Sequence, residues 1–449
     1  MPVRPVLLFF RNAIALFCFL SVFAYAVQWS VRYPSGPLRK TILSVADAPR
    51  FVVETLANIF GDPFAASRTP DQFSANWSYQ PIPNHTRHRI EGLVMRRGDS
   101  AEGPQPGWRM LYGIFQIDGE PQYAALALSP AFAVEHLWLV SRKDVGDTGL
   151  TFEQAPYPHG LALLSDGSIV AGFDTNYRTV RMAPCGGRMW LSDAYLNHAI
   201  YTVEGERFAW GVGNDDTITK VDLRTGKAVR IISAAEIAKA NPDVTALDML
   251  RIDDNGLGDN SRDFVEGYHS DPYHINDVEP LQPAMAASFP QFRAGDLLLS
   301  FRSLNMIAVV DPVSLHIKWF TNGYSFRQHD PDWNSNGEIS VIDNEMGRDF
   351  SRIMSFDPAT GGHRTLVAGK AFNFYTRIRG KHQSLDNGGM IITSSGQGRI
   401  FELGRDGRIA SEILVMDPRN PGKNFVVSEA TVFPSNDPIF GKVRTCTKP

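Results

Sequence analysis

The sequence is poor in cysteine, with Cys18, Cys185 and Cys446 the only three in 449 residues. Their wide separation excludes both a CxxC metal clip and a dense disulfide framework, although Cys185 and Cys446 could pair if distant parts of the chain meet. Charge of one sign is also lacking, because the formal net charge is -4 and no basic run is long enough to follow a phosphate backbone. The composition therefore predicts a folded protein that does not bind nucleic acid.

Long apolar runs are nearly absent as well. One stands out, Asn12–Trp29, which has 18 residues without a charge and follows Arg4 and Arg11. We predict a retained signal anchor, with residues 1–11 in the cytoplasm, residues 12–29 crossing the inner membrane and the rest on the periplasmic side. The segment Ala24-Tyr25-Ala26 offers a cleavage site, so a removed export signal is the alternative.

Histidine is the residue that is present in a pattern. Five histidines begin five similar units, each of which continues into a turn and an apolar strand: His159, His198, His274, His329 and His382. The intervals between them are 39, 76, 55 and 53 residues. A repeat of roughly 40 to 50 residues that accepts insertions is typical of propellers and solenoids.

The apolar runs inside the units decide between those two architectures. After His329 come Ile339–Ile342, Arg352–Phe356 and Thr365–Val367, separated by turn-forming sequences. Each unit therefore reads as a four-stranded antiparallel meander, and the lack of a 3.6-residue period excludes a helical solenoid. We predict an all-β fold with a six-bladed β-propeller over residues 106–440, seven blades being the alternative. Residues 30–105 are expected to form a juxtamembrane linker, and residues 441–449 a tail.

Four segments in this order carry a family resemblance: DPYHIND (271–277), GDLLLSFRSLN (295–305), FRQHDPDWNSNGEISVIDNEMGR (326–348) and KHQSLDNGGMIITSSGQGRIFEL (381–403). Together they resemble the arylsulfotransferase family, bacterial sulfotransferases that take the sulfuryl group from phenolic sulfate esters. The resemblance covers about half of the chain. It implies a six-bladed propeller with the active site in the central channel, an aryl sulfate donor, a phenolic acceptor and no nucleotide sulfate donor.

The resemblance also implies roles for individual residues. His382 matches the histidine that becomes transiently sulfated, His274 and His329 match its histidine partners, and Arg348 matches the family arginine. These types suit the chemistry, because cationic and hydrogen-bonding groups stabilise charge on sulfuryl oxygens and a neutral imidazole can attack sulfur. One further histidine can exchange a proton with the phenolic oxygen, so ping-pong kinetics are expected.

Three more residues are expected to bind substrate: Arg302, His198 and Asn276. Arg302 ends a predicted inner strand and could bind sulfate, although pairing with a carboxylate would serve it equally well. His198 is in phase with the other repeated histidines, which a closed propeller would bring together, but it matches no catalytic motif of the family. No metal or cofactor is predicted.

Two other functions fit a propeller. A calcium-dependent lactonase or hydrolase would need carboxylates on the axis, but the in-phase positions hold histidine rather than Asp or Glu. The acidic segment Asp253–Asp259 lacks the spacing and closing Glu of an EF-hand. A membrane-anchored propeller that only binds partners would use the same histidines as anion binders without turnover.

Overall fold

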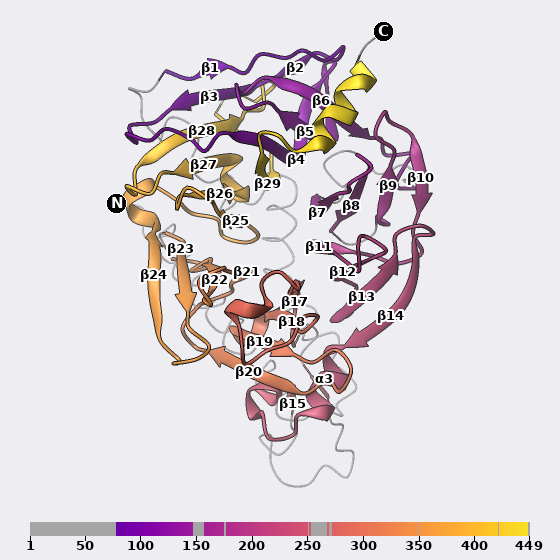
Figure 1. The fold of residues 1–449 in the computed structure, drawn as a ribbon, viewed down its shortest axis with the longest axis vertical. Helices are drawn as coiled ribbons and strands as arrows, with labels where there is room; N and C mark the ends of the chain where they lie inside the picture. The colour runs from indigo at the N-terminus through magenta and orange to yellow at the C-terminus, as the bar shows by residue number, and fades with distance from the viewer. Residues whose placement is uncertain are drawn as a thin grey trace, which may run out of the picture. The chain divides into compact units, whose positions relative to one another are not determined.

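The computed structural model describes residues 78–146, 157–174, 177–249, 251–252, 267–268, 272–348, 350–420 and 422–447. Six antiparallel sheets follow one another along this part of the chain and lie around a common axis (Figure 1). The predicted all-β, six-bladed propeller is therefore confirmed. The predicted anchor, residues 12–29, lies outside the described residues, among which no helix is long and apolar enough to cross a membrane.

Four blades are meanders of four consecutive strands, and the first strand of each is innermost. Blade 2 contains β7 (Pro158–Leu163), β8 (Ile169–Phe173), β9 (Val180–Met182) and β10 (Arg188–Leu191). Blade 3 contains β11 (Asn197–Val203), β12 (Phe208–Val212), β13 (Thr217–Asp222) and β14 (Lys227–Ser233). Blade 4 contains β17 (Ile275–Pro280), β18 (Leu297–Phe301), β19 (Met306–Val310) and β20 (Ile317–Asn322). Blade 5 contains β21 (His329–Trp333), β22 (Ile339–Asp343), β23 (Arg352–Phe356) and β24 (His363–Ala368).

The remaining two blades join the two ends of the described chain. In blade 1 the inner strand is β29 (Val427–Pro434), which pairs with β4 (Gly107–Ile117), followed by β5 (Glu120–Leu128) and β6 (Val134–Val140). Blade 6 contains β25 (Lys381–Ser384), β26 (Met390–Ser394), β27 (Arg399–Leu403) and β28 (Ile409–Val415). Strand β28 pairs with β3 (Leu93–Arg97), which pairs with β1 (Gln80–Pro81), and β2 (Ile90–Glu91) pairs with β4.

Closure from both ends leaves few free sheet edges, the usual solution in propellers. It also means that the sheet begins before residue 106, so part of the expected linker belongs to the last blade. Two covalent or ionic features support the closed ring. The carboxylate of Glu412 pairs with Arg96 and Arg399, all nearly buried. A disulfide joins Cys185 to Cys446, so the pairing that the sequence left open is made.

Burial falls from the axis to the rim and explains the strand sequences. Strand β18, Leu-Leu-Leu-Ser-Phe, is buried at every position because neighbouring blades cover both of its faces. Strand β24 at the rim is exposed at five of its six positions. The apolar runs visible in the sequence are thus the middle strands of the blades.

The described helices and the remaining short elements lie outside the blades. They are α3 (Ala234–Ala240), η3 (Thr245–Asp248), η5 (Ala286–Ser288), η6 (Arg302–Leu304), η7 (Gly369–Phe372), η8 (Ser395–Gln397), α4 (Pro438–Val443) and η9 (Arg444–Thr447), with β15 (Arg251–Ile252) paired to β16 (Gly267–Tyr268). Helix α4 is capped by Asp437 and buries Phe440, which stacks on Trp108 of blade 1 at 4.5 Å.

Candidate active site

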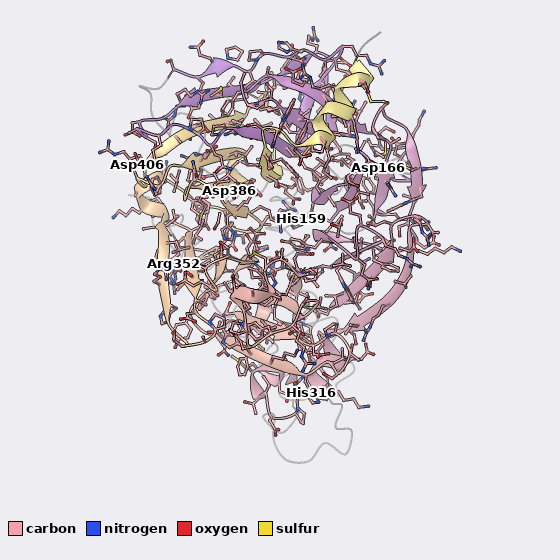
Figure 2. All side chains as sticks on the ribbon, in the orientation of Figure 1. His159, Asp166, His316, Arg352, Asp386 and Asp406 are labelled. Carbon is pink, nitrogen blue, oxygen red and sulfur yellow. A yellow bond between two sulfur atoms is a disulfide. The ribbon has the colours of Figure 1, made fainter. Side chains whose placement is uncertain are left out.

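Four of the five repeated histidines meet where the inner strands begin. The ring of His198 lies 4.1 Å from that of His159, 5.9 Å from that of His274 and 6.1 Å from that of His329, measured between centroids. Figure 2 shows His159 near the middle of the ring of blades, whereas His316 lies at the rim. We call these four residues the histidine cluster. The prediction that circular closure gathers distant histidines is confirmed for them.

Local backbone distortions accompany the cluster. Strands β7, β11, β17 and β21 each lose regular register close to their histidine. The backbone adopts a positive φ at His198 (60°), His274 (45°) and Asp330 (58°). Such bulges re-aim side chains and are frequent at functional sites.

The hydrogen bonds of His329 are fully determined. The amide of Asn344 donates to the carbonyl oxygens of Thr376 and Arg379, both at 2.8 Å, so its Oδ1 must accept from Nδ1 of His329, at 2.7 Å. Nε2 of His329 then accepts from the backbone N–H of Arg379 at 3.2 Å. With both nitrogens engaged, His329 is a neutral residue that positions the loop carrying Arg379.

That loop supplies a cation that the sequence did not reveal. The Arg379 guanidinium pairs with Asp174, whose other oxygen accepts a hydrogen bond from Nδ1 of His159 at 2.7 Å. Burial alone would raise the pKa of Asp174, but Arg379 and His159 lower it below its usual value. An ionised carboxylate therefore fixes the orientation of the His159 ring.

His198 is the central member of the cluster and is partly exposed, as is His274, whereas His159 and His329 are buried. Its Nδ1 lies against the side-chain oxygen of the adjacent Asn197, which leaves the basic lone pair on Nε2. Desolvation, followed by the nearby His159 and His274, lowers the pKa of His198 well below 6.5. Arg302 contributes to the same shift, and its backbone N–H donates to the carbonyl oxygen of His274 at 3.1 Å, so it lies near the cluster. His198 is thus neutral at neutral pH.

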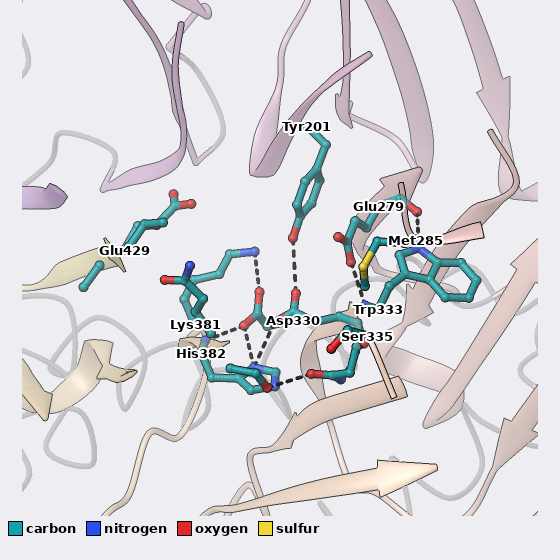
Figure 3. A pocket seen from close by; sticks show the side chains of 15 residues that line it. Tyr201, Glu279, Met285, Asp330, Trp333, Ser335, Lys381, His382 and Glu429 are labelled. Carbon is teal, nitrogen blue, oxygen red and sulfur yellow. Dashed lines mark hydrogen bonds and ion pairs between the residues drawn. The ribbon is translucent and has the colours of Figure 1, made fainter. Parts of the chain in front are cut away.

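The same inner strands carry a second group of side chains, which we call the carboxylate pocket (Figure 3). It comprises Tyr201, Asp277, Glu279, Asp330, Asp332, Lys381, His382 and Glu429. The Lys381 ammonium lies 2.6 Å from Asp330 and 3.1 Å from Asp277. Asp277 and Asp332 are not at the in-phase positions, which hold His274 and His329; they follow these histidines by three residues, next to the bulges in β17 and β21.

These carboxyl groups do not share one charge state. Burial alone would raise the pKa of Asp330, but Lys381 and His382 lower it to about 2. Desolvation raises the pKa of Glu429 to about 8 and, with the charge of Asp330, raises that of Asp332 well above its usual value. At neutral pH the pocket therefore holds an ion pair of Asp330 with Lys381 among protonated carboxyls.

His382 belongs to this pocket. Nδ1 lies 2.8 Å from Asp330 Oδ2, Nε2 lies 2.7 Å from Ser340 Oγ of blade 5, and the side chain is fully buried. His382 lies outside the histidine cluster because of the register of its strand. His329 pairs with the fourth residue of β22, but in the next blade it is Lys381, and not His382, that pairs with the fourth residue of β26. Lys381 thus occupies the position of the histidine in the preceding blade, and His382 points to the opposite face of the strand.

Two cavities open beside these groups. One, of ≈ 380 Å³, is lined by the carboxylate pocket together with Met285 and Trp333. The other, of ≈ 370 Å³, has an apolar wall of Met110, Leu161, Ile200 and Phe433. Leu161 and Ile200 follow His159 and His198 by two residues, so the strands that carry the histidine cluster also line an apolar space large enough for an aromatic ring.

The other predicted residues are placed as follows. Arg348 lies in an exposed loop and pairs with Glu345 of the same loop. Asn276 is buried and donates to the carbonyl oxygen of Gln328, between blades 4 and 5. The structure thus brings His198, His274, His329 and Arg302 together and places His382, Arg348 and Asn276 elsewhere. Arg379 was missed because it lies in a loop outside the repeated motif. Asp174 lies inside the motif, 15 residues after His159, as Asn344 lies 15 residues after His329, and this shared spacing is the signal that could have found it.

Comparison with known proteins identifies a family. The family described as Arylsulfotransferase (ASST) matches residues 182–415, more than half of the chain. No curated protein matches. Similar solved structures include a Bacteroides caccae protein of unknown function, 9% identical over 73% of this chain and 99% of that one, with a TM-score of 0.42. Another is virginiamycin B lyase from Staphylococcus aureus, 10% identical over 62% and 86%, with a TM-score of 0.35. These likenesses are too distant to argue from.

The site is a cluster of imidazoles, with Arg302 nearby, where the inner strands of a six-bladed propeller begin. The chain belongs to the arylsulfotransferase family. Its family resemblance, predicted from four short motifs, is confirmed.

Proposed function

We propose that the chain moves a sulfuryl group from a phenolic sulfate ester to a phenolic acceptor, with a histidine as transient carrier. The observation that carries the proposal is the histidine cluster, in which four imidazoles lie together with Arg302 nearby, while two of the same strands line a cavity that has an apolar wall. Family membership supports the reaction type, and the Arg302 guanidinium carries N–H donors for a sulfuryl oxygen.

The carrier in this proposal is His198. It is the partly exposed imidazole at the centre of the cluster, and its lowered pKa keeps it neutral. Nε2 attacks sulfur, the bond between sulfur and the phenolic oxygen breaks, and the phenol leaves with one proton. In the second half, the acceptor phenol loses a proton, its oxygen attacks sulfur, and the bond between sulfur and Nε2 breaks.

His159 is the group that exchanges the proton, at Nε2: its imidazolium form gives that proton to the leaving phenolic oxygen, and the neutral ring then takes one from the acceptor phenol. Its ring lies 4.1 Å from that of His198, and Asp174 holds its Nδ1–H, as in other Asp-His pairs that perform acid-base catalysis. The apolar wall of Leu161 and Ile200 would receive the aryl ring of donor or acceptor.

The motif-based assignment of His382 as carrier is the second candidate. One observation favours it: Asp330 accepts from Nδ1, which leaves the lone pair on Nε2. Against it, Ser340 already engages Nε2, and the side chain is fully buried beside the ionised Asp330 carboxylate, which repels a sulfate ester.

The experiment is a transfer assay with 4-nitrophenyl sulfate as donor and phenol as acceptor. We expect nitrophenolate release that phenol accelerates, and a loss of roughly 10³-fold or more in His198→Gln. His316→Gln, a histidine at the rim, should match the wild type. No release with several aryl sulfates would overturn the proposed function.

A further inference from the structure

We propose that Asp330, Asp332 and His382 form a binding site for one divalent transition-metal ion, of the Mn²⁺ or Zn²⁺ type, facing the ≈ 380 Å³ cavity. This site is separate from the histidine cluster and goes beyond the proposed sulfuryl transfer. One ligand atom from each residue lies within 4.8 Å of the others, about twice a metal–oxygen bond of 2.0–2.6 Å.

The two carboxylates converge on the imidazole. Nδ1 of His382 lies 2.8 Å from Asp330 Oδ2 and 3.5 Å from Asp332 Oδ2. Asp330 and Asp332 are two residues apart on β21, and the positive φ of Asp330 with the local bulge turns both toward the neighbouring blade. The bulge, and not the regular alternation of a strand, thus makes two oxygen ligands face a single nitrogen ligand.

Each ligand is held from behind by a different partner. Lys381 binds the other oxygen of Asp330 at 2.6 Å, the Tyr201 hydroxyl lies 3.5 Å from the other oxygen of Asp332, and Ser340 Oγ lies 2.7 Å from Nε2 of His382. Metal-binding histidines almost always donate their second ring N–H to such a partner, and ligating carboxylates are likewise hydrogen-bonded. The three contacts leave Nδ1 and one oxygen of each carboxylate directed at the same point.

An independent observation shows that the polar atoms around this site are not all satisfied. Asp277 is fully buried, and its Oδ1 has no hydrogen-bond partner among the described residues, while its Oδ2 shares Lys381 with Asp330. One ammonium thus serves both Asp277 and Asp330. Metal binding displaces protons from ligating carboxyls, so Asp332, protonated in the metal-free pocket, would release its proton to bind the ion.

The ligand types select the metal. One imidazole nitrogen with two carboxylate oxygens suits Mn²⁺, Zn²⁺ or Fe²⁺, whereas Ca²⁺ takes oxygen ligands only. The cavity leaves the remaining coordination positions open to water or to an oxygen of a small molecule.

The test uses the full chain, stripped with a chelator and titrated calorimetrically with Mn²⁺, Zn²⁺ and Ca²⁺. We expect one equivalent of Mn²⁺ or Zn²⁺, bound more tightly than Ca²⁺ by at least roughly tenfold. Asp332→Asn should weaken binding by roughly 10–100-fold, as should Ser340→Ala, which keeps all three ligands. Glu429→Gln, which removes a carboxyl from the same cavity but no ligand, should bind as the wild type does.

A Co²⁺ absorption spectrum that changes in His382→Gln would support imidazole ligation. Thermal unfolding of each metal-free variant shows whether it is folded. If Asp332→Asn is not folded, Ser340→Ala takes its place as the test. The proposal is overturned if none of the three metals binds, if Ca²⁺ binds as tightly as Mn²⁺, or if Glu429→Gln weakens binding as much as Asp332→Asn.

Discussion

His159 donates a hydrogen bond from Nδ1 to Asp174, and the partner oxygen of that carboxylate is held by Arg379 from a loop next to blade 6. Replacing Asp174 with Asn removes the charge that stabilises a protonated His159 and allows the wrong tautomer. We expect kcat to fall by roughly 10²–10⁴-fold with phenyl sulfate, whose leaving oxygen needs a proton.

The kcat of the same variant should fall much less with 4-nitrophenyl sulfate, because nitrophenolate is a weaker base and leaves without proton transfer. If Asp174 had only a structural role, the substitution would reduce kcat by the same factor with both donors. Comparison of kcat for the two donors in wild type and Asp174→Asn distinguishes these outcomes.

Glu412 stabilises the seam where the two ends of the propeller meet. Its carboxylate pairs with Arg96 and Arg399, so Glu412→Gln leaves two buried guanidinium groups without their counter-charge. We expect a loss of about 3–5 kcal/mol in the free energy of unfolding. The control is Glu102→Gln, which removes an exposed pair with Arg405 and should cost at most about 1 kcal/mol. Equal denaturation midpoints for both variants would show that the Glu412 ion pairs do not stabilise the fold.

His136 should make unfolding depend on pH. Burial lowers its pKa from 6.5 to about 4, with its Nε2 against the carbonyl oxygen of Pro184. Between pH 6.5 and pH 4, His136 is therefore protonated in the unfolded chain but not in the folded chain. Its contribution to the free energy of unfolding is intact above pH 6.5 and is lost as the pH falls toward 4. The loss is at most about 3 kcal/mol.

The measurement is urea unfolding of wild type and His136→Gln at pH 7 and pH 4.5. We expect the stability difference between the two proteins to shift in favour of the variant at the lower pH. A difference that does not change with pH would show that His136 is not the titrating group.

The disulfide between Cys185 and Cys446 ties the segment between β9 and β10 to the C-terminal η9, across 261 residues. Cross-links that close long loops restrict the unfolded chain, and we expect Cys446→Ser to lose about 2–4 kcal/mol. A reducing agent should lower the unfolding temperature of the wild type and leave that of Cys446→Ser unchanged. An equal effect of reductant on both proteins would argue against the bond.

The sequence was sufficient for the architecture because middle strands of a propeller are buried on both faces. The run Arg352–Phe356, for example, was predicted with the bounds that β23 has in the structure. The strand pairing that closes the propeller was harder to predict. Strands β1 and β3 are short and lie before the first long strand, so nothing in the local sequence indicates that β3 pairs with β28.

The site was only partly predictable, for a geometric reason. Histidines at equal spacing along the sequence are expected on the same side of the inner strands only where the register of those strands is regular. Bulges after His274 and His329 bring Asp277 and Asp332 to the axis, and the regular β25 places Lys381 there instead of His382. A bulge depends on tertiary packing, so the sequence carried no signal for this exchange.

The most direct test of the central claim is the mass of the protein after a donor is added without an acceptor. Intact-mass measurement should show one added sulfuryl group that phenol removes, and peptide mapping under non-acidic conditions should place it on His198. An adduct on His382 would contradict the carrier assigned here, and the absence of any adduct in a protein that still transfers sulfuryl groups would contradict a covalent histidine carrier altogether.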